Sequence, residues 1–135
     1  FITGAPMLRK YDADGSLIYE RYIYGRQLDP YLAAQPNRWP RREVQDREVP
    51  FVTPVVRAAA VDRDGRVWIS LGIPYTYVYD ADGDKVRTVQ FQAAGIVSPT
   101  SLSVTRDGRL LVTPGLYEFD ASLPPAGGSR VRSPR

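Results

Sequence analysis

Residues 62–67 read Asp-Arg-Asp-Gly-Arg-Val and residues 105–110 read Thr-Arg-Asp-Gly-Arg-Leu, so one short phrase returns 43 residues further along the chain. A second phrase, Tyr-Val-Tyr-Asp at 77–80, returns as Tyr-Glu-Phe-Asp at 117–120, which is 40 residues later. A period of about 40–45 residues in a strand-rich sequence is the spacing of propeller blades. The repeat therefore predicts an all-β chain built from blade units of four short strands.

Strand and turn signals divide the chain into five segments. We expect residues 1–24 to form the last strands of a first blade, 25–54 an insert between blades, 55–91 a complete blade, 92–120 an incomplete final blade, and 121–135 a disordered tail rich in Ser, Pro, Gly and Arg. The expected fold is thus a partial β-propeller of about two and a half four-stranded blades.

This blade number implies partners for the sheet faces and edges, because a closed ring takes four to eight blades. We expect the remaining blades to come from the same protein, of which this chain would be the C-terminal portion, or from another chain. A ring assembled from several copies of this chain is the alternative.

The insert at 25–54 breaks the repeat and carries the candidate contact residues. Asp29-Pro30 has the form of an N-cap followed by a proline at the first helical position, which predicts a short helix. Trp39, Arg41 and Arg42 follow it, and Trp and Arg are enriched at binding hot spots. Either these three residues bind a partner, or Trp39 anchors the loop to the blade and the arginines are solvated or paired with nearby acids, Glu43 and Asp46.

Composition excludes several classes of site. The chain has no Cys and no His, which removes disulfides, thiolate chemistry and the commonest general base and metal ligand. Three of its 18 basic residues lie among the last six, so residues 1–129 hold 15 bases and 15 acids. A neutral body predicts no nucleic-acid partner. No apolar stretch is long enough to predict a membrane span.

Two repeated side-chain patterns could be mistaken for ligand sites. Asp-x-Asp-Gly at 12–15, 62–65 and 80–83 starts like a calcium loop, but position 12 counted from Asp80 is Phe91 rather than a bidentate Glu. We interpret these segments as hairpin turns, which every blade needs. The second pattern is the row Tyr75, Tyr77 and Tyr79, which we interpret as packing between neighbouring sheets rather than as a sugar or peptide site.

The segment 79–87, which begins Tyr-Asp-Ala-Asp-Gly and ends Val-Arg, and the segment 60–68, Ala-Val-Asp-Arg-Asp-Gly-Arg-Val-Trp, together resemble NHL-type six-bladed β-propellers, whose blades carry an Asp-x-x-Gly-x-hydrophobic turn. The resemblance covers about residues 7–24 and 55–120. It implies a kinship with uncharacterised bacterial propeller proteins, often exported, and hence an extracytoplasmic location.

The leading function hypothesis is a non-catalytic binding scaffold that takes a protein, peptide or glycan through loops on one propeller face, with no cofactor. The resemblance also implies an alternative, since some six-bladed propellers are metal-dependent hydrolases of the lactonase type. Their axial metal needs Glu, Asp and Asn ligands, which for this chain would lie on blades upstream. Some NHL propellers bind RNA, which the neutral body of this chain disfavours.

Overall fold

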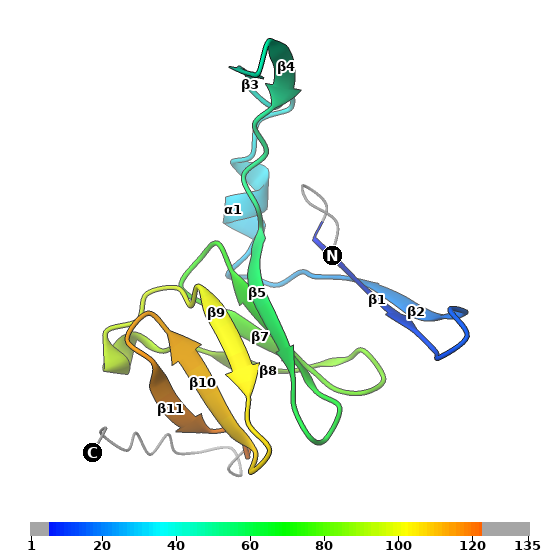
Figure 1. Cartoon of the computed structure of the whole chain (residues 1–135), viewed down its shortest axis with the longest axis vertical. Helices are drawn as coiled ribbons and strands as arrows, with labels where there is room; N and C mark the ends of the chain where they lie inside the picture. Colours follow the sequence, from blue (N-terminus) through cyan, green and yellow to red (C-terminus); the bar gives the residue numbers. More distant parts are fainter. Residues whose placement is uncertain (1–5, 123–135) are drawn as a thin grey trace. The chain divides into compact units, whose positions relative to one another are not determined.

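The computed structural model describes residues 6–122, and these divide into two compact units, one ending at Val55 and one beginning at Val56. Antiparallel strands dominate both, which confirms the all-β class predicted from the repeat. The strands belong to four separate sheets, and within the described residues there is one short α-helix and one 3₁₀ turn (Figure 1). The predicted tail lies outside the described residues from position 123 onward.

The first unit contains two hairpins separated by a helix. Strands β1 (Met7–Tyr11) and β2 (Leu17–Tyr22) form the first hairpin, and β3 (Arg41–Val44) and β4 (Arg47–Pro50) form the second. The helix between them, α1, is a single turn and a half at Asp29–Ala33. Proline at its start and Pro36 beyond its end limit its length, as the sequence predicts.

Two details of the insert differ from the expectations. Leu28, not Asp29, occupies the N-cap position, and no side chain caps the helix, so Asp29 lies inside the first turn, where a negative charge suits the helix dipole. The β3–β4 hairpin replaces the expected irregular loop. Its two-residue turn has positive φ at both Gln45 (50°) and Asp46 (58°), the geometry that suits the twist of tight hairpins.

The second unit contains a four-stranded sheet followed by a three-stranded sheet. Strands β5 (Val56–Val61), β6 (Val67–Leu71), β7 (Thr76–Tyr79) and β8 (Lys85–Val89) pair in chain order, each antiparallel to the next. A 3₁₀ turn, η1 (Gln92–Ala94), leads to β9 (Ser101–Val104), β10 (Arg109–Thr113) and β11 (Tyr117–Asp120). The first strands of the two sheets, β5 and β9, pack against each other.

A hydrophobic core joins these two sheets. Trp68 and Val78 face each other across β6 and β7, and they pack in one cluster with Leu110 and Val112 of β10. Ala58 and Ala60 of β5 border the same cluster as small, half-buried side chains. Small side chains on the first strand allow the two sheets to approach closely there.

Candidate functional site

The three predicted contact residues lie on or next to the β3–β4 hairpin. Trp39 precedes β3 and is half-buried, whereas Arg41 and Arg42 are exposed neighbours on β3. Because side chains alternate along a strand, Arg41 and Arg42 belong to opposite faces of the hairpin. The structure therefore gathers the three residues within one element but does not bring the two guanidinium groups to one point.

Both arginines have partners within the first unit. Arg41 Nη2 donates to the Glu48 carbonyl oxygen at 3.1 Å, and its Nε lies 3.4 Å from a Glu48 carboxylate oxygen. The Arg42 guanidinium lies over the Phe51 ring, 5.0 Å from its centroid. The acid beside Arg41 is thus Glu48 across the ladder rather than Glu43 or Asp46. Exposed pairs of this kind contribute little to stability, so they leave both side chains available to a partner.

The hairpin that carries these residues is unusually exposed. Every residue of β3 is exposed, and in β4 Val49 is half-buried while its neighbours are exposed. Among residues 6–122, each strand pairs with the other and with no third strand, so the outer edge of each presents backbone groups that no described strand pairs. Exposed Val44 and Phe51 add apolar surface to the same element. An exposed two-stranded ladder is marginal in water on its own and suited to pairing with another chain.

The repeated Asp turns are held by their own backbone. Asp12, Asp62 and Asp80 each accept hydrogen bonds through Oδ1 from the amides two and four residues later, at 2.8–3.2 Å. In the β9–β10 turn, Thr105 stands where the other turns have their first Asp, and its hydroxyl accepts a hydrogen bond from the Arg109 amide at 3.0 Å. These contacts support the interpretation as turns. Within residues 6–122 no cluster of three or more acidic side chains is arranged to hold a metal ion.

Asp62 differs from the other turn residues because its carboxylate is also the centre of a buried polar network. Its Oδ2 accepts from Trp68 Nε1 at 2.8 Å and from Arg66 Nε at 2.7 Å, and its side chain is 2% exposed. Burial disfavours ionisation of this carboxyl, but the hydrogen bonds from Trp68 and Arg66 outweigh it and lower the pKa of Asp62. Arg66 also reaches Asp64 and the Ala121 carbonyl oxygen.

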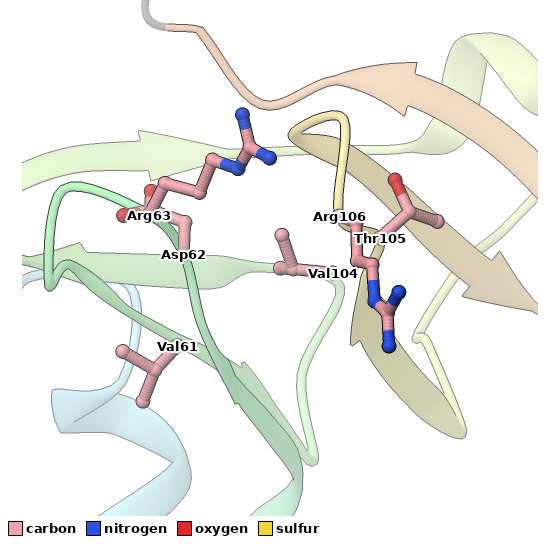
Figure 2. Close-up of a pocket in the computed structure, with 6 residues that line it drawn as sticks. All are labelled: Val61, Asp62, Arg63, Val104, Thr105 and Arg106. Atoms are coloured by element: carbon pink, nitrogen blue, oxygen red, sulfur yellow. The ribbon is translucent and has the colours of Figure 1, made fainter.

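An open pocket of about 290 Å³ lies between the β5–β6 turn and the β9–β10 turn. Six residues line it, three from each turn, and in Figure 2 the guanidinium groups of Arg63 and Arg106 point in different directions. The three from the first turn are Val61, Asp62 and Arg63, and the three from the second are Val104, Thr105 and Arg106. The two sets occupy the same positions in the repeat, 43 residues apart.

The tyrosine row behaves as a packing layer. Tyr77 and Tyr79 are buried and Tyr75 is half-buried, which leaves no exposed aromatic platform on β7. The Lys85 ammonium lies 4.2 Å from the centroid of the Tyr77 ring, a cation–π contact across neighbouring strands. The burial of Tyr77 and Tyr79 agrees with the interpretation of this row as packing.

Sequence reasoning missed the pocket and the Asp62 network. The signal for the pocket was present, because Val-x-Arg recurs at 61–63 and 104–106 directly before each Asp-Gly. Nothing in the sequence indicated that Asp62 alone among the turn acids would accept from a tryptophan. That contact depends on Trp68 returning along β6 to lie beside the turn.

No protein-family model, curated protein or solved structure matches this chain. Over residues 6–122, no helix has the length and apolar character needed to cross a membrane.

Proposed function

We propose that this chain is part of a non-catalytic β-propeller that binds a protein or peptide partner through its β3–β4 hairpin. The observation that carries the proposal is the exposure of that hairpin, which holds Arg41, Arg42 and Val44 on a ladder whose edges pair with no other strand in the described part of the chain. Arginine and exposed apolar side chains beside unpaired strand edges favour a polypeptide partner, because backbone groups of an extended chain can pair with the edge.

The propeller part of the proposal is supported by the second unit. Its four-stranded sheet has the strand order of a blade, and the sheet that follows packs against it through the first strands, β5 and β9. Sheets in that relation suit neighbouring wedges around an axis, as the 43-residue repeat predicts. The NHL resemblance of the two Asp-Gly turns agrees with this arrangement and stays a proposal.

A photo-crosslinking experiment tests the binding surface. A benzoylphenylalanine placed at Arg47, exposed on β4, should crosslink to one partner in the source organism, whereas the same group at exposed Ile18 on β2 should not. The partner is then purified for affinity measurements with the intact chain. Crosslinks at both positions in equal yield would show that the hairpin has no special role.

The affinity measurement uses matched arginine variants. The double variant Arg41→Ala/Arg42→Ala should weaken partner binding at least tenfold, about 1.4 kcal/mol or more, because hot-spot side chains contribute on that scale. Arg21→Ala, which removes an exposed arginine from β2, should leave the affinity within about twofold. Unchanged affinity in the double variant would refute the hairpin as the binding surface.

A further inference from the structure

The last strand of the second unit has one edge that no described strand covers. In the three-stranded sheet the order is β11-β10-β9, so β11 pairs with β10 along one edge only (Figure 1). The four-stranded sheet continues one strand further, because β8 pairs with the outer edge of β7. Among residues 6–122, the three-stranded sheet therefore has no counterpart of β8.

The strand β7 stands at the same position of the repeat as β11 and has an outer neighbour. Tyr-Val-Tyr-Asp at 77–80 corresponds to Tyr-Glu-Phe-Asp at 117–120, with an offset of 40 residues. Every residue of β7 is buried, whereas in β11 half-buried residues alternate with exposed ones. The two aromatic side chains of β11 pack on the core cluster but stay half-buried. A strand beside β11 would cover part of these rings and pair the outer backbone groups.

The pairing of β8 with β7 defines the kind of strand that fits such an edge. The register pairs three residues of β8 with three of β7: Lys85 with Tyr79, Arg87 with Val78, and Thr88 with Tyr77. Lys85 also places its ammonium 4.2 Å from the centroid of the Tyr77 ring. The outer strand of the four-stranded sheet therefore reads Lys-Val-Arg-Thr over residues 85–88, and both of its cations lie opposite residues of β7.

The same pattern occurs once more in the sequence, after β11. Residues 130–133, which lie outside the described residues, read Arg-Val-Arg-Ser and match residues 85–88 in side-chain class at all four positions. Nine residues, 121–129, separate this segment from β11, which is enough chain to reverse direction. We propose that residues 130–133 bind the outer edge of β11 as an antiparallel fourth strand. For these four residues the proposal replaces the disorder expected of the tail.

The charges on β11 favour a basic strand at this edge. Transferred to β11, the register of β8 places Arg132 opposite Glu118, at the position where β7 has the uncharged Val78. Glu118 shares one face of the sheet with Arg109 and Asp120, because side chains alternate along each strand. Arg109 lies 3.3 Å from Glu118, so this face has one cation for two acids. An arginine on the other side of Glu118 would balance the charge, and cross-strand pairs of opposite charge stabilise an antiparallel ladder.

Amide exchange of the ¹⁵N-labelled full chain, followed by NMR, tests the pairing. A strand paired on both edges protects all of its amides, whereas an edge strand leaves alternate amides to solvent. All amides of residues 117–120 should therefore exchange slowly. The variant Arg132→Pro/Ser133→Pro removes consecutive backbone donors, one of which must face β11, so alternate amides of β11 should exchange at least tenfold faster. Amides of β6 and β7 should stay protected, which shows that the variant folds. Equal exchange of β11 in both proteins would overturn the proposal.

Charge reversal tests the register. Arg132→Glu places an acid opposite Glu118 and should speed the exchange of the same β11 amides at least threefold. Adding Glu118→Arg restores opposite charges across the two strands, so exchange in this double variant should return to within about twofold of the unaltered protein. Arg135→Glu changes the net charge equally but lies outside residues 130–133, so it should leave β11 unchanged. Equal acceleration by Arg132→Glu and Arg135→Glu would reduce the effect to net charge and refute the proposed pairing.

A peptide and a dilution series distinguish the chain's own segment from a second copy. Acetyl-Gly-Ser-Arg-Val-Arg-Ser-amide, the sequence of residues 128–133, should restore the protection of β11 in the proline variant in a saturable manner. Protection in the unaltered protein should not change on tenfold dilution, because the segment belongs to the same chain. Protection that falls on dilution, together with a dimer in size-exclusion chromatography, would assign the edge to a second copy and overturn the proposal.

Discussion

Two buried hydroxyl groups that face each other in the four-stranded sheet, those of Ser70 and Thr76, should affect the stability of the fold in opposite directions. Ser70 and Thr76 are paired across β6 and β7, and both are fully buried. Ser70 Oγ donates to the Pro99 carbonyl oxygen at 2.8 Å, whereas Thr76 Oγ1 finds no partner in the described structure. A buried hydroxyl without a hydrogen bond has lost its water contacts without compensation.

Replacing these hydroxyls should therefore have opposite effects. Thr76→Val keeps the side-chain shape and removes the unpaired oxygen, so we expect the free energy of unfolding to rise by up to about 1 kcal/mol. Ser70→Ala leaves the Pro99 carbonyl unpaired and should lower it by about 1–2 kcal/mol. Urea denaturation of both variants at neutral pH measures the two values. A destabilised Thr76→Val variant would mean that the hydroxyl has a partner after all.

The Asp62 network makes stability depend on pH. The pKa of Asp62 is lowered in the folded state. The ionised carboxylate therefore stabilises the fold at pH values above the ordinary Asp pKa of about 3.9. This contribution is lost as the pH falls through the lowered folded-state pKa, because the folded protein must then take up the proton. We expect the free energy of unfolding to fall as the pH drops below about 4.

Asp62→Asn tests this assignment. The amide would turn a donor toward the donors Trp68 Nε1 and Arg66 Nε, so the variant should lose about 2–3 kcal/mol at pH 7 and show a flatter acid limb. Asp80→Asn keeps the same turn contacts in a more exposed position and should change stability by less than about 0.5 kcal/mol. Urea denaturation from pH 7 to pH 2 provides both readouts. Equal losses in the two variants would contradict the special role of Asp62.

At the scale of elements, the glycine of the β10–β11 turn has little space for a side chain. Gly115 has φ of +91°, and a Cβ there would clash with the Tyr117 ring at the start of β11. Gly95, after η1, also has positive φ, +75°, but a Cβ would meet nothing within 4 Å. Both glycines thus have positive φ, but only Gly115 lacks room for a Cβ atom.

Alanine substitution should separate these two costs. Gly95→Ala introduces only the strain of a left-handed backbone, about 1 kcal/mol, whereas Gly115→Ala must also displace the Tyr117 ring and should cost at least about 1 kcal/mol more. Thermal unfolding followed by circular dichroism gives the ranking. Similar melting temperatures for the two variants would show that Tyr117 moves aside freely.

The elements of the second unit could be predicted because each lies between strong turn signals. Asp-Gly at 64–65, 82–83 and 107–108 fixed where β5–β6, β7–β8 and β9–β10 reverse, since glycine accepts the positive φ that these turns require. The β3–β4 hairpin could not be found in this way. Its turn uses Gln45 and Asp46 without glycine, and its exposed strands lack apolar alternation.

The candidate site was only partly predictable for a related reason. Residue type and a place outside the repeat indicate Trp39, Arg41 and Arg42, but the face that each occupies follows from a strand that the sequence does not reveal. Arg63 and Arg106 lie inside the repeat, so the sequence pattern assigns them to hairpin turns and not to a pocket. Which arginine of a turn is paired and which is free depends on tertiary contacts such as Arg66 with the Ala121 carbonyl.

At the scale of the whole molecule, burial predicts a strong contrast in backbone protection. All residues of β7 are buried, as are all of β6 except half-buried Val67, whereas β3 is exposed throughout. Hydrogen–deuterium exchange followed by mass spectrometry should show the slowest exchange in β6 and β7 and near-complete exchange of residues 41–50 within seconds. Slow exchange at 41–50 in the isolated chain would indicate that the hairpin is already covered.

The two ends of the four-stranded sheet carry different kinds of turn. Because β5 to β8 run up and down in order, the β5–β6 and β7–β8 turns share one end, and a Cβ on Gly65 would lie 3.6 Å from Ala81 Cβ. Gly65 and Gly83 both have positive φ, 75° and 87°, so the backbone at this end of the sheet favours glycine in each turn. The opposite connection, Gly72-Ile73-Pro74, contains no Asp-Gly turn, but its residues are half-buried and the Tyr75 amide donates to the Ile73 carbonyl oxygen at 2.7 Å, so an insertion there would also disturb packed backbone.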